Sequence, residues 1–448
     1  MDSAARAYDI AIFGASGFTG AFVAEALARL LADPAHPALP GGRPPLRVAL
    51  AGRSAARLRE VQERARAAAP ALPPFALLLA DVGDAASLAA LARSSVLLLN
   101  CVGPFRLFGE PVVAACVGGG CHYLDITGEP EFMERVELRF GEEAARAGVC
   151  VVPCSAFDSI PADLGVAFAV QQLAERCSGA AATSVASYLT LRTGPHGFGG
   201  HFATYESAVL GFGSVAELQR TRRAYALRYP HLARVPLPGA PPPKRGAWFA
   251  RAGVWCLPFP GSDASVVRRS QRALHAARLA SGADAARLPA PVHYEAFFTV
   301  ASTWSLCLSA LFGGALSLLA PWAWGRRLLL ACPGAFSGGI FSHAGPSAAQ
   351  LRETSFEMEV VARGAGGEEA RCCVRGPEPG YVATPALLLG AALTLLEVRG
   401  SGGGGGGGGG ALGACAGGVH TPASAFRDTA LLQRLRALGV SFEPLERT

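Results

Sequence analysis

Residues 8–20 read Y-D-I-A-I-F-G-A-S-G-F-T-G, and they determine the architecture of the first third of the chain. The apolar run from Ile10 to Phe13, rich in β-branched residues, is typical of a buried parallel strand. Three glycines follow at once, and apolar residues at helical spacing then predict a helix over 18–31. A strand, a glycine-rich turn and a helix N-terminus together form a site for a pyrophosphate, because the first amides of the helix point at the ligand.

The glycine spacing is G-x-x-G-x-x-G, which has one residue more in its first gap than the common dinucleotide fingerprint. The first glycine permits the sharp turn, the second lets the backbone approach the phosphates, and the third lets the helix pack against the strand. An ordinary structural turn is the alternative, since the chain has 55 glycines. We expect the cofactor to contact Gly14, Ser16, Gly17, Phe18, Thr19 and Gly20.

The end of the second strand bears on the choice of cofactor. This strand, predicted over 47–51, is followed by Gly52, Arg53 and Ser54. An acidic residue here would bind the ribose 2′-hydroxyl of NAD, whereas a basic residue accommodates a 2′-phosphate. We therefore predict that Arg53 and Ser54 favour NADP(H) over NAD(H). The alternative for Ser54 is a role as the N-cap of the next helix.

Alternation of strands and helices continues to about residue 155 and predicts a doubly wound parallel sheet, a Rossmann domain, over 1–155. Asp81 follows the third strand, where it could reach the adenine. Asn100, Val102 and Gly103 follow the fourth strand, where the ribose and nicotinamide would lie. The other predicted elements are helices 55–69, 111–118 and 130–147 and strands 75–79, 96–101, 122–126 and 149–153.

The strand–helix period ends after residue 155, and 156–400 is predicted to form a second, α+β domain with an antiparallel or mixed sheet. A glycine-rich loop at 400–416, with an uninterrupted tract at 402–410, precedes a C-terminal segment, 417–448, that packs back on the core. The strands expected in this part are 184–192, 294–301, 355–363 and 371–376, and the helices are 385–398 and 427–438.

Positive charge is uneven along the chain. The net charge of +6 is too small to imply a nucleic-acid partner, but Asp263 is the only acidic residue in the basic segment 218–272. Such a segment suits a negatively charged membrane surface, and a solvated loop in an arginine-rich chain is the alternative.

Between Glu295 and Arg326 no residue is charged, and this apolar insertion, 296–325, exceeds the length that a membrane-spanning helix needs. A single span would separate strands that are expected to share one sheet. We therefore predict a re-entrant or hairpin insertion that turns near Gly313-Gly314 or Pro321, with Trp322 and Trp324 at the membrane interface. A long buried helix or an oligomer interface is the alternative.

The twelve cysteines show no spacing typical of a metal site, so no metal is expected. The first strand begins by residue 8, which leaves no room for a signal peptide, and the cysteines suit a reducing, cytosol-facing compartment.

Seven motifs are spread over nearly the whole chain: G-A-S-G-F-T-G (14–20), A-G-R-S (51–54), N-C-V-G-P-F (100–105), D-I-T-G-E-P (125–130), F-D-S-I-P-A-D (157–163), G-Y-V-A-T-P (380–385) and G-G-V-H-T-P (417–422). They stand in the order seen in the saccharopine dehydrogenase-like oxidoreductases, and the chain resembles the animal branch of that family. The resemblance implies a Rossmann domain with a substrate and dimerisation domain, and thus a homodimer. It also implies association with lipid droplets or mitochondria and, from a mycobacterial enoyl reductase of glycolipid assembly, a lipid-like substrate.

Hydride transfer usually needs a proton donor or acceptor beside the substrate. Lys244 is the only lysine, and it lies in a proline-rich loop, so the Tyr-x-x-x-Lys pair of short-chain dehydrogenases is excluded. Asp125, at the end of strand 122–126, and Asp158, which follows strand 149–153, are the predicted catalytic residues. The alternative for Asp158 is a role as the N-cap of the next helix. Three functions stay open: an oxidoreductase of a lipid-like carbonyl or enoyl group, a catalytically idle scaffold on lipid surfaces, and a soluble amino-acid reductase.

Overall fold

The computed structural model describes residues 6–41, 45–243, 245–281, 288–400 and 415–446. It divides into two compact units. The first comprises Met1–Thr127, Arg135–Ile160 and Gly380–Val440, and the second comprises Gly128–Glu134, Pro161–Pro379 and Ser441–Thr448. The glycine tract 402–410 lies outside the described residues.

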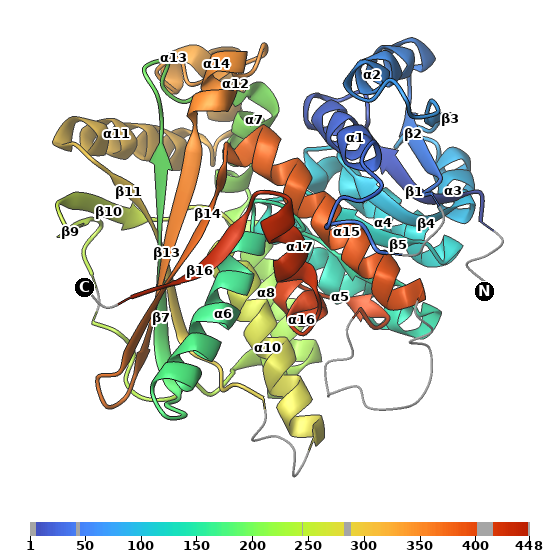
Figure 1. The fold of residues 1–448 in the computed structure, drawn as a ribbon. Helices are drawn as coiled ribbons and strands as arrows, with labels where there is room; N and C mark the ends of the chain where they lie inside the picture. The colour runs from blue at the N-terminus through green and yellow to red at the C-terminus, as the bar shows by residue number, and fades with distance from the viewer. Residues whose placement is uncertain (1–5, 42–44, 244, 282–287, 401–414, 447–448) are drawn as a thin grey trace. The chain divides into compact units, whose positions relative to one another are not determined.

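A seven-stranded sheet forms the centre of the first unit, with the order β15-β6-β5-β4-β1-β2-β3 (Figure 1). Every neighbouring pair in it is parallel, which confirms the predicted doubly wound sheet. The order reverses between β1 and β4, because β2 and β3 extend the sheet one way and β4 to β6 extend it the other. The strands are β1 (Tyr8–Phe13), β2 (Val48–Gly52), β3 (Ala76–Leu79), β4 (Ser95–Asn100), β5 (His122–Asp125), β6 (Cys150–Val152) and β15 (Gly418–Val419).

The helices of this sheet follow the predicted alternation with two differences. Helix α3 is not among the elements expected from the sequence. Helix α4 begins six residues before the expected start at Pro111, which instead lies inside the helix. Proline is common at a helix start, so it was a misleading boundary signal here. The helices are α1 (Phe18–Leu31), α2 (Ala55–Ala68), α3 (Ala85–Ser94), α4 (Phe105–Gly119) and α5 (Pro130–Ala147).

The first unit also contains a long apolar helix from late in the sequence. Helix α15 (Thr384–Gly400) packs against α1, β4 and β5, after a π-helical turn at Pro379–Ala383. In the described part of the chain, Pro379–Gly400 is the one helix long and apolar enough to cross a membrane, and 78% of its most apolar window is buried. The compact unit around the glycine turn therefore extends beyond 1–155 and takes in a segment that the sequence analysis assigned elsewhere.

A buried arginine joins α15 to the rest of its unit. Arg434 lies on α17 (Leu431–Ala437), which follows α16 (Pro422–Phe426). Its guanidinium donates to the Ala38 carbonyl at 2.7 Å, to Thr394 Oγ1 at 2.5 Å and to Glu397 Oε2 at 2.6 Å. These bonds fix the C-terminal helices to α15 and to the loop that follows α1.

The second unit is built on another seven-stranded sheet, with the order β16-β14-β13-β7-β11-β10-β9. The β7–β11 pair is parallel and the other pairs are antiparallel, so the sheet is mixed. The four strands expected here are present. The strands are β7 (Ala182–Arg192), β9 (Phe249–Arg251), β10 (Val254–Pro258), β11 (His293–Val300), β13 (Ser355–Gly364), β14 (Glu369–Pro377) and β16 (Ser441–Leu445).

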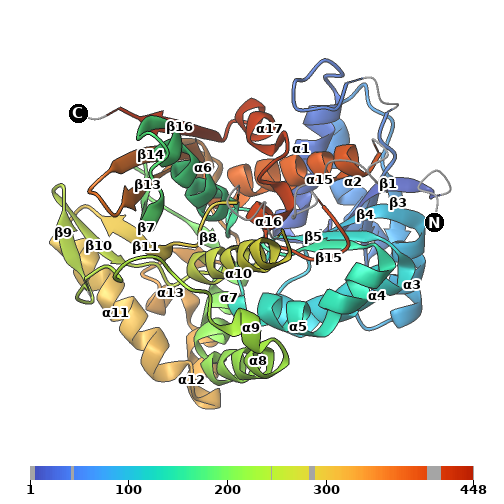
Figure 2. The same ribbon diagram turned by 90° about the horizontal axis from the view of Figure 1, so that it is seen from below.

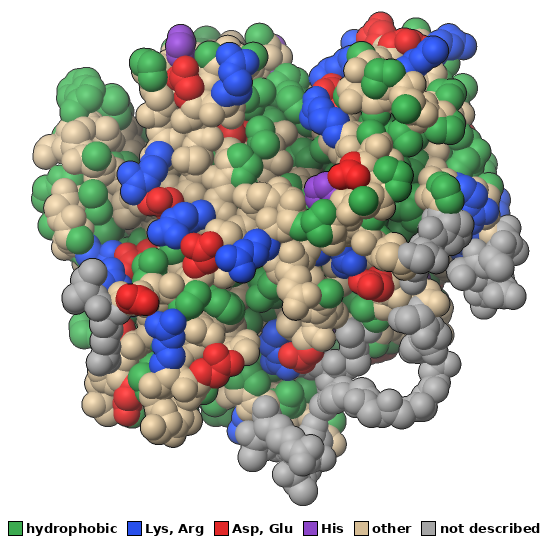
Figure 3. Space-filling view, in the orientation of Figure 1, with side chains coloured by type: hydrophobic (Ala, Val, Ile, Leu, Met, Phe, Trp, Pro, Cys, Tyr) green, Lys and Arg blue, Asp and Glu red, His purple; other side chains and the backbone are tan. Residues whose placement is uncertain are grey.

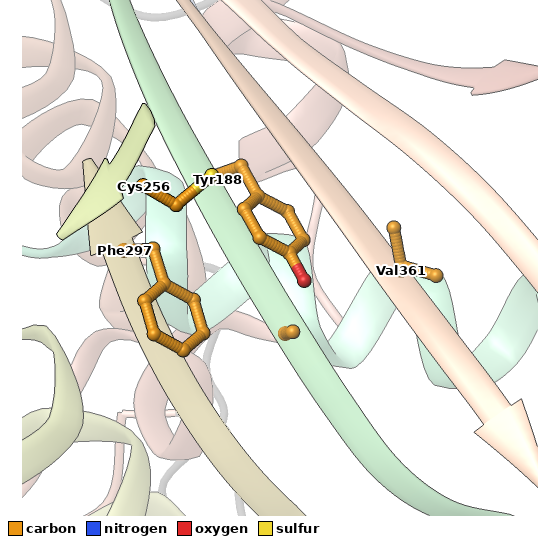
Figure 4. Close-up of a cluster of buried hydrophobic side chains, with 5 residues drawn as sticks. Tyr188, Cys256, Phe297 and Val361 are labelled. Atoms are coloured by element: carbon orange, nitrogen blue, oxygen red, sulfur yellow. The ribbon is translucent and has the colours of Figure 1, made fainter. Parts of the chain in front are cut away.

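Helices α6 (Ile160–Arg176) and α10 (Asp263–Ser281) pack on one face of this sheet. The opposite face carries a cluster in which the rings of Tyr188 and Phe297 stack with centroids 5.4 Å apart, beside Cys256 and Val361 (Figure 4). The Arg251 guanidinium lies 4.0 Å from the Tyr188 ring centroid and also pairs with Glu359. Ion pairs thus cover apolar side chains on this face, as expected for a sheet with one face toward water.

A separate core in the second unit joins α7 (Phe202–Phe212), α11 (Thr303–Leu319) and α12 (Ala323–Ala331). Helix α11 runs unbroken through Gly313-Gly314, so the chain does not turn there, whereas Pro321 lies in the break between α11 and α12. The Arg326 guanidinium donates to the Ala320 carbonyl at 2.8 Å and fixes this turn. The remaining elements are β8 (Gly200–His201), α8 (Val215–Arg228), α9 (Pro230–Ala233), β12 (Phe341–Ser342), α13 (Pro333–Phe336) and α14 (Ala348–Glu353).

Candidate functional site

The turns after β1 and β4 meet at the point where the strand order reverses. Gly14 has a φ of 81°, a left-handed conformation that favours glycine. A methyl group at Gly14 would lie 2.7 Å from Val102 Cγ2 and 3.0 Å from the Cys101 carbonyl carbon, so the two turns touch here. In open α/β sheets, ligands bind at such a reversal, outside the carboxyl ends of the strands. The turn predicted from the sequence therefore lies where a dinucleotide would bind.

The rest of the turn fits a pyrophosphate. A methyl group at Gly20 would collide with the backbone carbonyl of Gly14, so a glycine is needed for α1 to approach the turn this closely. Gly17 is exposed, donates to the Gly14 carbonyl at 2.9 Å, and starts α1 without a side-chain cap. The first amides of a helix have no acceptor within the helix, and an anion supplies one. Ser16, Phe18 and Thr19 are partly exposed along the same turn.

The residues expected to distinguish NADP from NAD lie at the end of β2. Arg53 is exposed there, and the Ser16 hydroxyl lies against Gly52, 3.3 Å from where a methyl group on that glycine would stand. The Ser54 hydroxyl accepts from the Arg57 amide at 3.4 Å, so Ser54 takes the N-cap role that was its alternative assignment. Arg53 is thus an exposed basic side chain at the end of β2, where the 2′-phosphate of NADP is expected.

Asp81 and Asn100 are both in contact with backbone amides. Asp81, exposed after β3, accepts from the Gly83 amide at 2.8 Å. Asn100, buried at the end of β4, accepts from the Val102 amide at 3.0 Å and donates to the Tyr123 hydroxyl at 3.0 Å. Asn100 therefore shapes the turn that contains Val102 and the exposed Gly103.

Asp125 is the centre of a buried hydrogen-bond network. One carboxylate oxygen accepts from the Tyr123 hydroxyl at 2.8 Å, and the other accepts from the amides of Thr127 and Cys154 at 3.0 and 2.9 Å. Asp125 is fully buried, and the burial of Tyr123, together with the nearby Asp125 charge, raises the pKa of Tyr123 well above its usual value. The carboxylate thereby joins the segments that follow β5 and β6, and it is linked to the end of β4 through Tyr123 and Asn100.

Asp158 has a different environment. It lies after β6, in the segment that begins at Cys154, a residue with a left-handed backbone (φ 60°). In the described part of the chain no group donates a hydrogen bond to its carboxylate. Burial raises the pKa of Asp158 from 3.8 to about 6. A carboxyl group with such a pKa can exchange a proton near neutral pH, and perturbed pKa values of this kind are common in active sites.

The sequence analysis did not identify Tyr123 or Cys154 as parts of this site. Tyr123 lies two residues before Asp125 in a strand, and side chains at that spacing point to the same face, so a signal was present. The contact between the Cys154 amide and Asp125 joins residues that are 29 positions apart, and no local pattern encodes it.

Polar residues of two further motifs, 157–163 and 417–422, have structural partners. Asp163 lies in the first turn of α6, and both its carboxylate oxygens accept from the Ser270 hydroxyl of α10, at 2.6 and 2.8 Å. His420 Nε2 lies 2.9 Å from the Ala416 carbonyl. Among the described residues no three His, Cys, Asp or Glu side chains are placed to hold a metal ion.

Three arginines of the basic segment are paired with carboxylates within the second unit. Arg222 forms a bidentate pair with Glu134, at 3.0 and 2.8 Å. Arg251 pairs with Glu359 at 2.7 Å, and Arg220 pairs with Glu217 at 2.6 Å. The segment thus offers less free charge to an anionic surface than its composition indicates.

Residues 10–152 match the family described as the saccharopine dehydrogenase NADP binding domain. The chain is 37% identical to the saccharopine dehydrogenase-like oxidoreductase of Mus musculus, over 99% of this chain and 98% of that one. It is 32% identical to the lipid droplet localized protein of Caenorhabditis elegans (97% and 98%), and 31% identical to a Mycobacterium tuberculosis protein whose name describes a trans-acting enoyl reductase (99% and 99%). Apo saccharopine dehydrogenase (L-Glu forming) of Saccharomyces cerevisiae has a similar fold, with a TM-score of 0.52 at 13% identity over 98% of this chain and 100% of that one.

Proposed function

Because the chain belongs to the saccharopine dehydrogenase-like oxidoreductases, we propose that it is an NADP(H)-preferring oxidoreductase that acts on a carbonyl or enoyl group of a lipid-like substrate at a membrane or lipid-droplet surface. The observation that carries the proposal is the glycine turn at the strand reversal, in one compact unit with the half-buried Asp158, whose carboxyl group has a raised pKa. Bound NADPH would supply the hydride in this chemistry. The names of the nematode and mycobacterial relatives support the lipid surface and the enoyl group.

The two aspartates have separate roles in this proposal. Asp158 supplies the proton. Its carboxylic acid protonates the oxygen of a carbonyl group when the hydride adds to the carbonyl carbon, or the α-carbon of an enoyl group when the hydride adds to the β-carbon, and Asp158 is left as a carboxylate. Asp125 cannot easily share that task, because its oxygens already accept three hydrogen bonds. It instead positions the turns after β4 and β6, between which the nicotinamide and the substrate would lie.

The lipid surface is assigned to one face of α11 and the turn into α12. Trp304, Leu308, Leu311 and Leu318 recur along α11 at helical spacing and are exposed, whereas the opposite side of the helix packs on α7. Trp322 and Trp324 are exposed at the turn. Figures 1 and 2 place α11 and α12 at the rim of the second unit, and Figure 3 shows hydrophobic side chains gathered over the position of α11.

Charge supports a lipid surface as the occupant of this face. Residues 296–352 contain no Asp or Glu, and Arg327, beside the two tryptophans, is exposed. An apolar helix face with flanking tryptophans and arginine is typical of helices that lie in the plane of an anionic membrane interface. Because this face is exposed, we favour a lipid contact over a helix buried in the protein. Because α11 is continuous, we favour a helix that lies on the lipid surface over a hairpin that turns within the lipid.

Liposome flotation tests this surface. We expect the triple variant Trp304→Ser, Leu311→Ser, Leu318→Ser to lower the fraction bound to phosphatidylcholine–phosphatidylserine vesicles about tenfold or more, because the buried apolar area provides the affinity. Leu79→Ser, Leu227→Ser, Leu279→Ser is the matched control, since these leucines are 60% to 85% exposed but lie elsewhere. Equal binding by both variants and the wild type would remove the proposed surface. A wild type that never floats would indicate the soluble amino-acid reductase.

Cofactor preference is tested at Arg53. Arg53→Ala should weaken NADPH binding roughly ten- to a hundredfold, because a charge-assisted contact to the 2′-phosphate is lost, and should leave NADH binding nearly unchanged. Calorimetry with both cofactors measures the ratio. Arg57→Ala, four residues further along in α2, is the control for loss of positive charge. An equal loss for NADH and NADPH would contradict the assignment.

Turnover then distinguishes an enzyme from an idle scaffold. Oxidation of NADPH is followed at its near-ultraviolet absorbance with a panel of enoyl and ketone lipids. An oxidoreductase consumes NADPH with at least one of them. Binding without consumption across the panel would favour the scaffold.

A further inference from the structure

Tyr381 contacts the cofactor turn from a distant part of the sequence. It lies in the π-helical turn before α15 and is 5% exposed. Its ring meets the Phe18 ring edge-on, with centroids 4.9 Å apart, and it lies 5.6 Å from the Phe22 centroid. The rings of Phe18 and Phe22 are themselves 5.4 Å apart, so the three aromatic residues form one cluster within the first unit.

Phe18 links this cluster to the backbone amides that would bind the pyrophosphate. Phe18 is the first residue of α1 and follows Gly17 directly, so its backbone amide belongs to the helix turn that would bind the pyrophosphate. Gly17 has no side chain to fix the turn, and α1 begins without a side-chain cap. A rigid ring on the next residue, packed against Tyr381, can hold the direction of these amides.

The other side of the cluster is also fixed. The Arg64 guanidinium of α2 lies 5.9 Å from the Phe22 centroid, and Arg64 pairs with Glu25 at 2.5 Å. Phe22 thus has Arg64 on α2 and Tyr381 before α15 as neighbours, and Phe18 contacts Tyr381 more closely than Phe22 does. Tyr381 therefore packs on both rings, and it packs more closely on Phe18, the residue that begins α1.

We infer that Tyr381 is a positioning residue for the cofactor: it holds Phe18, and through Phe18 the first amides of α1, in the orientation that binds the pyrophosphate. This inference rests on the proposed binding of NADP(H). It gives the motif G-Y-V-A-T-P (380–385), which contains Tyr381, a role in cofactor binding. The proposed hydride and proton transfers use no residue of this motif.

The test separates positioning from simple packing. In Tyr381→Ala we expect the dissociation constants of NADPH and NADH to rise by the same factor, about tenfold, because both carry the pyrophosphate. Tyr381→Phe, which keeps the ring, should bind both within about threefold of the wild type. Adenosine 2′-monophosphate lacks the pyrophosphate, and its affinity should not change in either variant.

Leu30→Ala is the matched control, because Leu30 is also 5% exposed and lies on α1, but at its far end in a cluster with Ala38 and Leu393. It should lower the thermal midpoint as much as Tyr381→Ala does and leave the cofactor affinities unchanged. Unchanged NADPH affinity in Tyr381→Ala, or an equal loss in Leu30→Ala, would overturn the inference. A wild type that binds neither nucleotide would instead overturn the proposed function.

Discussion

Gly17→Glu is expected to raise the dissociation constant for NADPH roughly a hundredfold or more, while the protein remains folded. Gly17 is exposed, has an ordinary φ of −76°, and a methyl group there would meet only the Gly14 carbonyl, at 3.1 Å. The glutamate side chain would therefore extend into the space over the helix N-terminus. Its carboxylate would replace the pyrophosphate as the anion at the helix and would repel it, at a cost of several kcal/mol.

The control is the same substitution at another exposed glycine of the same unit. Gly118 lies on α4, has a right-handed helical backbone, and has nothing within 4 Å of an added methyl group. Gly118→Glu should bind NADPH as the wild type does. Calorimetry gives the affinities, and circular dichroism confirms that both variants are folded. If Gly17→Glu keeps wild-type affinity, the pyrophosphate does not bind at this turn.

Asp158→Asn is expected to lower the turnover number by roughly 10² to 10⁴, because an amide cannot donate or accept the proton in the reaction. The acid–base limb near pH 6 in the wild-type profile, which reflects the raised pKa of Asp158, should disappear in the variant. The affinity for NADPH should change little. Wild-type turnover by Asp158→Asn would exclude this residue as the proton donor.

Asp158→Asn should also stabilise the folded protein against unfolding, by an amount that depends on pH. The folded protein holds the Asp158 pKa at about 6, above its usual 3.8, so the neutral form is favoured. The stability gained by keeping Asp158 protonated in the folded protein is fully present only well below its usual pKa of 3.8, and it is lost as the pH rises through 6, by up to about 3 kcal/mol. Asparagine resembles the neutral acid, so the variant should unfold at a higher temperature than the wild type at a pH well above 6 and at the same temperature at a pH well below 3.8. Thermal unfolding at the two pH values measures the difference.

The strands and the glycine turn could be predicted because their signals are local. Ile10 to Phe13 are apolar and include two β-branched isoleucines, and the glycine spacing directly precedes a helical pattern, so strand, turn and helix follow from neighbouring residues. The order in which the strands lie side by side then follows from general rules for α/β sheets, and it places the turn at the reversal.

The parts that could not be predicted depend on contacts between distant residues. Helix α15 has a clear helical pattern, but nothing in residues 384–400 indicates that it packs on β4 and β5. The sequence did not indicate that arginines of the basic segment are paired, because their partner carboxylates, such as Glu134 and Glu359, lie outside the segment. Similarly, Asp125 and Asp158 look equivalent at the ends of strands, and only the three donors around Asp125 distinguish them.

Residues 380–440 belong to the same compact unit as the N-terminal residues, and this delays the folding of that unit during synthesis. The parallel sheet, whose β1 leaves the ribosome first, lacks α15 and the edge strand β15 until nearly all of the chain has been made. Until then the nascent protein exposes the apolar surface that α15 covers and an unpaired β6 edge, the features that make folding intermediates prone to aggregate. We therefore expect the nucleotide-binding half to mature after translation, with the help of chaperones, although it is encoded at the start of the message.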